Sequence, residues 1–232
     1  NFFNVASSDI TPHGKLFFQE QVNFADGMQQ SNTTLDLGLG HNAEVGINLN
    51  GFGLDHGPDG GLILNDSIQP YAPFILLNAQ KRFELGEKTA VSFGAQGGIS
   101  STANARQGGL VYCNFIYRNE ERGLKLVAGP YHASSSYFGE GDLLLGHDVG
   151  LQAGVEKSLV RDKLMLQADY ISGSHTLGEV VPGAAYNLTA HWILACGYQI
   201  PTGGSTSVNA LVFEVTYNPS GQEKAPHAHH EG

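Results

Sequence analysis

The stretch "TTLDLGLGHNAEVGINLNGFGLD", residues 33–55, decides the fold, because apolar and polar residues alternate on both sides of a short central turn. Strict alternation indicates extended strands that have one apolar and one polar face. The central Gly40-His41-Asn42 is typical of a tight turn between two such strands. The stretch therefore predicts a β-hairpin whose apolar face carries Leu35, Leu37, Leu39, Val45, Ile47 and Leu49.

The same alternation recurs along most of the chain, whereas helical periodicity is nearly absent. An even number of strands suits an up-and-down barrel whose two ends emerge on one side. We therefore predict an all-β protein, a single antiparallel transmembrane barrel over residues 14–217, with an N-terminal periplasmic segment at 1–13 and a flexible His-containing tail at 218–232. The predicted strands are 14–25, 31–40, 43–54, 70–84, 88–99, 108–118, 123–135, 147–158, 163–173, 179–189, 192–201 and 205–217.

The connections between these strands alternate in length. Residues 40–42 and 85–88 form short turns, whereas 55–69 and 135–147 are long and rich in Gly, Ser and acidic residues. Outer-membrane barrels have short periplasmic turns and longer outer loops. We therefore expect a bacterial outer-membrane protein with both termini in the periplasm. The first residue is not Met, so any signal peptide is expected to have been removed already.

Composition narrows the classes of partner. The net charge is −10 and only 15% of the 232 residues are charged. A basic surface that could bind nucleic acid is therefore not expected. No apolar run reaches the roughly 18 to 20 residues of a transmembrane helix, so a membrane role requires strands. The expected partners are the lipid bilayer and small solutes.

Charged residues on the polar face are predicted to line the lumen. One interpretation is a salt-bridged network that holds the interior together, and another is a filter that favours cations or neutral polar solutes; both can hold at once. Asp36 and Glu44 are expected to meet near the hairpin turn, where Arg82 and Lys125 lie at the right height to neutralise them. The full predicted set is Asp36, Glu44, Arg82, Lys125, Glu156, Asp169 and Glu214.

The predicted lumen is narrow. Twelve strands lie between the roughly eight that side chains can fill and the sixteen or more that leave an open channel. Small residues at inward positions either widen the lumen locally or relieve strand curvature. These residues are Gly46, Gly94, Gly150, Gly154, Gly183, Ala185 and Gly197.

Outward positions carry two further features. Aromatic residues near the short turns are expected to form a girdle at the periplasmic interface; they are Phe83, Tyr117, Tyr186, Trp192 and Tyr217. Glu20 breaks the apolar face of the first strand, and a bulge at residues 17–18 would turn it into the lumen. Alternatively, Glu20 and the outward His132 mark contacts with another copy of the chain or with a partner membrane protein.

The sequence resembles bacterial outer-membrane β-barrels, and more loosely the small porin-like "transporter" group associated with the meta-pathway of phenol degradation. The resemblance rests on "HGKLFFQEQVNF" (13–24), "LDLGLGHNAEVGINL" (35–49) and "GAAYNLTAHWILACGYQIP" (183–201). Many such barrels end on an aromatic residue, whereas here Tyr217 is followed by "NPSGQEKAPHAHHEG". The resemblance implies a porin-like channel.

The sequence contains only weak signals of a catalytic or metal-binding site. A hydrolase would need Ser, His and a polar orienting group together, and no nucleophile elbow surrounds His132 and residues 134–136. His227, His229 and His230 are either metal ligands or part of a non-binding tail. We predict no enzymatic activity and no cofactor. The predicted function is passive diffusion of small solutes, and the alternative is a non-conducting scaffold barrel that binds a partner complex through its wall, loops or tail.

Overall fold

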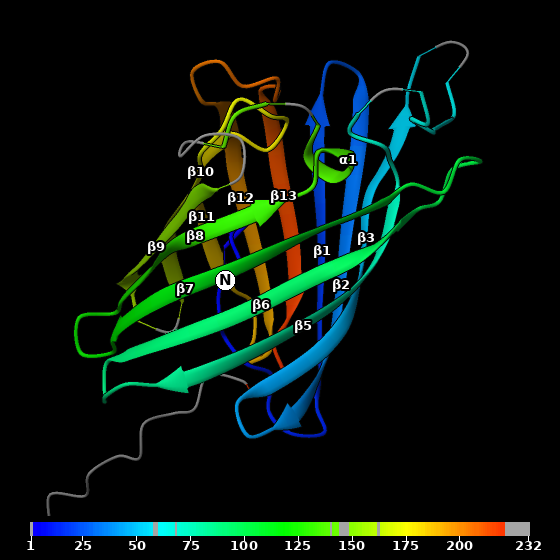
Figure 1. Ribbon diagram of the computed structural model, residues 1–232. Coiled ribbons are helices and arrows are strands. Elements are labelled where there is room, and N and C mark those ends of the chain that lie inside the picture. Colours follow the sequence, from blue (N-terminus) through cyan, green and yellow to red (C-terminus); the bar gives the residue numbers. More distant parts are fainter. Residues whose placement is uncertain are drawn as a thin grey trace, which may run out of the picture.

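The structure is a computed structural model that describes residues 2–57, 60–67, 69–139, 141–143, 149–161 and 163–220. Within these residues twelve long antiparallel strands form one closed barrel, as the alternation predicts (Figure 1). The sheet closes because β2 pairs with β1 on one side and with β3 on the other. The long strands are β1 Leu16–Ala25, β2 Met28–Gly40, β3 Ala43–Asp55, β5 Phe74–Glu84, β6 Thr89–Ser100, β7 Gln107–Asn119, β8 Leu124–Ala133, β9 Gly150–Val160, β10 Leu164–Ile171, β11 Glu179–Asn187, β12 Trp192–Pro201 and β13 Ala210–Tyr217.

The hairpin that decides the fold forms as predicted. Leu35 pairs with Ile47 and Leu37 with Val45 across strands β2 and β3. At the turn between them, Gly40, His41 and Asn42 have φ angles of 82°, 52° and 55°. Gly and Asn adopt this left-handed backbone at low cost, so the sequence supports the reversal at this point.

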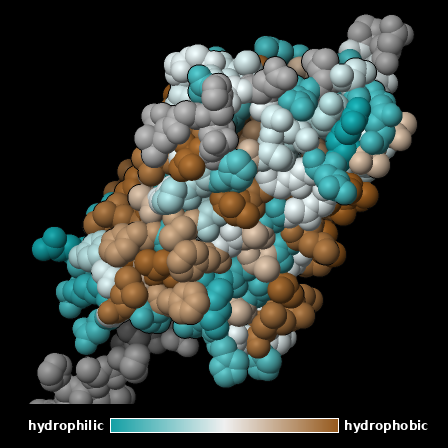
Figure 2. Space-filling view, in the orientation of Figure 1, coloured by the Kyte–Doolittle hydropathy of each residue, from teal (hydrophilic) through white to brown (hydrophobic). Residues whose placement is uncertain are grey.

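The outer wall of the barrel is apolar. Leu77, Phe93, Val111 and Phe115 are exposed on successive strands β5, β6 and β7. Figure 2 shows apolar side chains over the middle of the visible wall, with hydrophilic residues toward its rims. A continuous exposed apolar wall suits contact with lipid. Among the described residues, none of the helical structure is long or apolar enough to span a membrane.

Two short elements were not predicted from the sequence. Strand β4, Leu62–Ile63, pairs with the end of β3, and α1, Ser135–Phe138, is a single helical turn. Both are too short for a hydrophobic period to register. The predicted strand at 205–217 was also too long, because β13 begins at Ala210. Ser205 and Ser207 bond instead to the His175 carbonyl (2.8 Å) and to Glu179 (2.9 Å).

The N-terminal segment, residues 2–12, lies inside the barrel, where Figure 1 shows the chain start behind the β7 and β6 strands. Phe2 and Phe3 are only 2% and 5% exposed. Phe2 packs with Ile116 and Val127, and Phe3 with Val181 and Val212. Inward apolar residues therefore gather around this segment. The sequence predicted a periplasmic segment at 1–13, whereas residues 2–12 lie within the lumen.

Candidate functional site in the barrel lumen

Inward glycines form seats for the two phenylalanine rings of the N-terminal segment. A Cβ added at Gly154 would lie 2.7 Å from the Phe2 ring, and a Cβ at Gly183 or Gly197 would lie 2.7 or 2.8 Å from the Phe3 ring. At such distances any larger residue at these positions would require the ring to shift. The predicted local widening is therefore filled by aromatic rings of the same chain.

Two inward carboxylates bind the backbone and side chain of Asn4. Asp169 accepts hydrogen bonds from the backbone N–H groups of Asn4 (2.6 Å) and Val5 (3.1 Å). Glu179 accepts a bond of 2.6 Å from the Asn4 side-chain amide. Asp169 was predicted as part of the lumen charge set, whereas Glu179 was missed because it begins a strand and was not recognised as inward. Both acids position the N-terminal segment.

Asp9 lies at the centre of an ion cluster in the lumen, formed with Arg118 and Lys125. Its carboxylate pairs with Arg118 and, at 2.6 Å, with Lys125. Lys125 also lies 3.9 Å from Glu156 and 5.0 Å from the centroid of the Phe2 ring. Loss of water around the Asp9 carboxylate opposes its ionisation, but Lys125 and Arg118 outweigh this and hold its pKa well below the usual range. The segment is therefore held by an ion cluster as well as by its rings.

Asp36 and Glu44 do not take the counter-ions that were predicted for them. Asp36 accepts a bond of 2.9 Å from Asn78. Glu44 accepts bonds from the Thr11 backbone N–H (2.7 Å) and from Gln80 (3.2 Å). Both carboxylates are 8% exposed. Among the described residues, neither has an ion pair with Lys or Arg. Hydrogen bonds rather than salt bridges therefore stabilise them.

The remaining charged residues of the predicted set also contact separate partners rather than one another. Arg82 pairs with Glu84 at 2.7 Å near the short turn after β5. Glu214 accepts bonds from Gln19 (2.6 Å) and Thr216 (2.7 Å). The prediction that Arg82 and Lys125 neutralise Asp36 and Glu44 was thus wrong. Physically, Asp9 on the inserted segment provides a carboxylate for Lys125, and the sequence contains no periodic signal for that residue.

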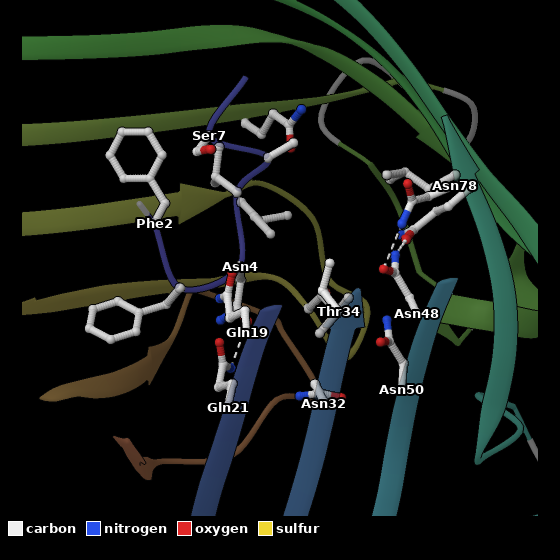
Figure 3. Close-up of a pocket in the computed structure, with 18 of the residues that line it drawn as sticks. Phe2, Asn4, Ser7, Gln19, Gln21, Asn32, Thr34, Asn48, Asn50 and Asn78 are labelled. Carbon is white, nitrogen blue, oxygen red and sulfur yellow. Dashed lines mark hydrogen bonds between the residues drawn. The ribbon is translucent and has the colours of Figure 1, made fainter. Parts of the chain in front are cut away.

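A cavity of about 560 Å³, lined by both polar and apolar side chains, lies beside the N-terminal segment. Asn218 and Ser220, after β13, line it at one end, and residues 206–208 and Tyr71 line it at the loop end. The cavity therefore runs along most of the barrel's height. Figure 3 shows side chains of β1, β2 and β3 that face residues of the N-terminal segment across this space; those labelled on the strands are Gln19, Gln21, Asn32, Thr34, Asn48 and Asn50.

The predicted aromatic girdle residues all lie at strand ends that adjoin short turns. Trp192 and Tyr217 are neighbours with ring centroids 5.2 Å apart. The Phe83 ring lies 6.1 Å from that of Phe93, and Lys163 lies 5.8 Å from the Tyr186 ring. Tyr117, at the end of β7, pairs with Thr89. Their role at a membrane interface stays a prediction.

Glu20 lies on the outer wall, and the bulge predicted at residues 17–18 is absent from the pairing of β1 with β2. Glu20 pairs with Thr33 in that ladder and accepts a hydrogen bond from the Thr33 hydroxyl. His132 is exposed on β8, six strands from β1 in either direction around the barrel. The two candidate interface residues therefore lie on opposite walls and do not form one surface.

Among the described histidines, His175 has the most enclosed environment. His175 is buried, and its ring bonds the Tyr131 hydroxyl (2.6 Å) and the Leu177 N–H (3.1 Å). Ser134, near His132, accepts a bond of 3.0 Å from the Gly109 N–H. The candidate metal ligands His227, His229 and His230 lie outside the described residues, so that prediction is untested.

Comparison with known proteins places the fold in one class. The sequence matches no protein-family model, and no curated protein matches it. In structure it resembles the NanC porin, with a TM-score of 0.57 and 9% identity over 88% of this chain and 98% of that one. It also resembles the COG4313 outer membrane channel from Pseudomonas putida F1, with a TM-score of 0.53 and 12% identity over 93% and 99% of the two chains.

A weaker likeness links the chain to outer membrane phospholipase A from Escherichia coli. The TM-score is 0.44 and the identity 12%, over 88% of this chain and 89% of that one. A similarity at this level carries no inference about activity. The chain has the fold of the outer-membrane β-barrels, and its stronger structural neighbours are porin-like channels.

Proposed function

We propose that this protein is a porin-like channel of a bacterial outer membrane that passes small solutes by passive diffusion, with both termini on the periplasmic side. The observation that carries the proposal is the cavity along the lumen, bounded by residues from both ends of the barrel. The apolar outer wall supports a membrane location, because it would otherwise face water. We propose more specifically that the protein is related to the small porin-like "transporter" group associated with the meta-pathway of phenol degradation.

The conducting route lies between the N-terminal segment and the wall formed by β1, β2, β3 and β5. Phe2 and Phe3 pack against the other side of the lumen, on glycines of β9, β11 and β12. The segment therefore narrows the lumen and forms one wall of the route. This geometry agrees with the narrow pore expected of a barrel with about twelve strands.

Planar-bilayer recording tests the channel directly. Purified barrel that migrates differently before and after heating on a gel is added to one chamber, and stable unit steps of current are expected. Well-folded protein that gives no steps over a range of voltages would refute the channel. An equal amount of heat-unfolded protein is the matched control.

The second candidate is a non-conducting scaffold barrel, and the inserted N-terminal segment favours it. The segment has apolar, hydrogen-bonded and ionic contacts with the barrel, all of which would have to persist in a blocked pore. Silence in the bilayer experiment would support this function.

We further propose that Glu20 marks a contact with another copy of the chain or with a partner membrane protein. A carboxylate on the lipid-facing wall of a barrel is unfavourable unless something polar covers it.

A further inference from the structure

One wall of the lumen cavity is built from neutral carboxamide and hydroxyl side chains in neighbouring strands. Gln21 lies beside Asn32, which lies beside Asn50, across strands β1, β2 and β3. One level away, Thr34 of β2 lies beside Asn48 of β3. The ladder continues to Asn78 and Gln96, which pair across β5 and β6. These side chains form a continuous neutral polar surface, and Figure 3 shows several of them pointing into the cavity.

Asn32 and Asn50 keep hydrogen-bonding capacity for a ligand, whereas Asn48, Asn78 and Gln96 bond within the protein. A carboxamide has two N–H donors and an oxygen that accepts two bonds. Asn32 uses its oxygen to accept one bond of 2.9 Å from the Gly51 N–H. Asn50 donates one bond to the Tyr137 hydroxyl. Both side chains are half-buried, so their other donors and acceptors lie within reach of a molecule in the cavity. Adjacent donors and acceptors match the paired hydroxyl groups of a sugar.

Charge on the cavity wall disfavours anions. Among the described residues that line the cavity, acidic side chains are present and Lys and Arg are absent. Asp36, Glu44 and Glu179 are buried side chains that themselves line the cavity. Anions in proteins are usually held by Arg or Lys, so the described lining offers an anion no cationic partner. Each of these carboxylates already accepts hydrogen bonds from the protein, so they are not open ligands for a cation.

We propose that the cavity is a binding site for a short neutral saccharide, held by the carboxamide ladder of β1, β2, β3 and β5. This inference rests on the proposed function and names the solute class of the channel. The volume of about 560 Å³ falls within the range of about 300 to 1,000 Å³ typical of small-molecule sites. Selectivity comes from many neutral hydrogen bonds and from a described lining without Lys or Arg, which leaves an anion no cationic partner.

Three trisaccharides of similar size and different charge test the proposal. Maltotriose is neutral, trigalacturonate is anionic and the glucosamine trimer is cationic. Each is titrated into detergent-solubilised protein by calorimetry, and each is added to single channels in a bilayer to measure blockage of the current. We expect maltotriose to bind most tightly. Tighter binding of trigalacturonate or of the glucosamine trimer would overturn the proposal.

Two sets of variants locate the site. Asn32→Leu with Asn50→Leu removes two facing carboxamides at nearly constant volume and is expected to weaken maltotriose binding by about tenfold or more. If that pair fails to fold, Thr34→Val provides an isosteric alternative. Thr33→Val is the matched control, because Thr33 is the next residue of β2 and faces outward. Equal binding by Thr34→Val and Thr33→Val, or by the wild type and the double variant, would refute the site.

The two measurements separate this inference from the channel. Maltotriose binding without unit currents would refute conduction and support the binding site. Unit currents without saccharide preference would support the channel and refute the binding site.

Discussion

A double-mutant cycle between Gly197 and Phe3 tests whether the N-terminal segment is seated as the structure shows. A Cβ at Gly197 would lie 2.8 Å from the Phe3 ring, whereas ordinary contacts begin at 3.4 Å, so the ring must withdraw by about 0.6 Å. Overpacking of this kind costs about 1 to 3 kcal/mol. Gly197→Ala is therefore expected to destabilise the protein by that amount when Phe3 is present.

The second arm of the cycle removes the ring. Phe3 is 5% exposed, and Phe3→Ala is expected to cost about 3 to 5 kcal/mol of the free energy of unfolding. In that background Gly197→Ala meets no ring and only Val181 Cγ1, at 3.1 Å, stays close, so most of its cost is expected to disappear. It could even stabilise the strand by about 0.5 kcal/mol, because alanine loses less backbone freedom than glycine on folding.

Urea unfolding of the four proteins in lipid vesicles, followed by tryptophan fluorescence, measures the coupling free energy. Trp192 lies on β12, the strand that contains Gly197, and provides the signal. Gly183→Ala is expected to differ, because its Cβ would also lie 2.5 Å from the Cys196 carbonyl oxygen, so its cost persists when Phe3 is removed. If Gly197→Ala costs the same with and without Phe3, the seat does not exist and the reasoning is wrong.

Three further predictions concern charged and titratable groups. The pKa of Asp9 is held below its usual range, so its contribution to seating the segment is present above pH 4 and is lost only in stronger acid, as the pH falls through the lowered pKa. Protease cleavage within residues 2–12 should therefore stay slow from pH 8 to about 4 and be faster in Asp9→Asn at all these values. An unchanged cleavage rate in Asp9→Asn would contradict the ion cluster. Burial lowers the pKa of His175 from its ordinary 6.5 to about 4. Between pH 6.5 and 4 the unfolded chain therefore gains a proton while the folded loop does not, so the stability of the loop should fall as the pH drops through this range. Hydrogen exchange of residues 172–178 measures the loop stability, and His175→Gln should abolish its pH dependence. Glu20→Gln should change the sedimentation of the detergent-solubilised protein if Glu20 lies in a contact, and identical sedimentation would argue against that interface.

The positions that the sequence predicted well are those where one physical requirement acts locally. A wall with lipid-compatible side chains on one face and polar ones on the other requires alternation at every strand, so the period of two locates strands to within a few residues. The hairpin at 33–55 formed in the expected register, because a slip of one residue would turn its leucines inward. The inward positions of Asp36, Glu44 and Lys125 follow from the same alternation.

The contacts inside the lumen could not be predicted in this way. Lys125 has the expected inward position, yet its partner Asp9 lies more than a hundred residues away in a segment without periodicity. Glu20 is outward because its strand runs without a bulge, and only the ladder registers establish this. The local sequence does not distinguish glycines that relieve strand curvature from glycines that contact an aromatic ring. Only the positions of the Phe2 and Phe3 rings assign Gly154, Gly183 and Gly197 to the second group.

The sequence by itself determined that this chain is a closed antiparallel barrel with an apolar wall and a polar interior, because alternation is a local property that every strand must satisfy. Tertiary structure alone decided what occupies that interior. The N-terminal segment enters the lumen, takes Lys125, Asp169 and Glu44 as partners, and leaves the carboxamide wall of β1, β2 and β3 facing a cavity. The reason is that contacts between residues far apart in sequence depend on how the closed barrel brings them together, and no local pattern encodes that distance.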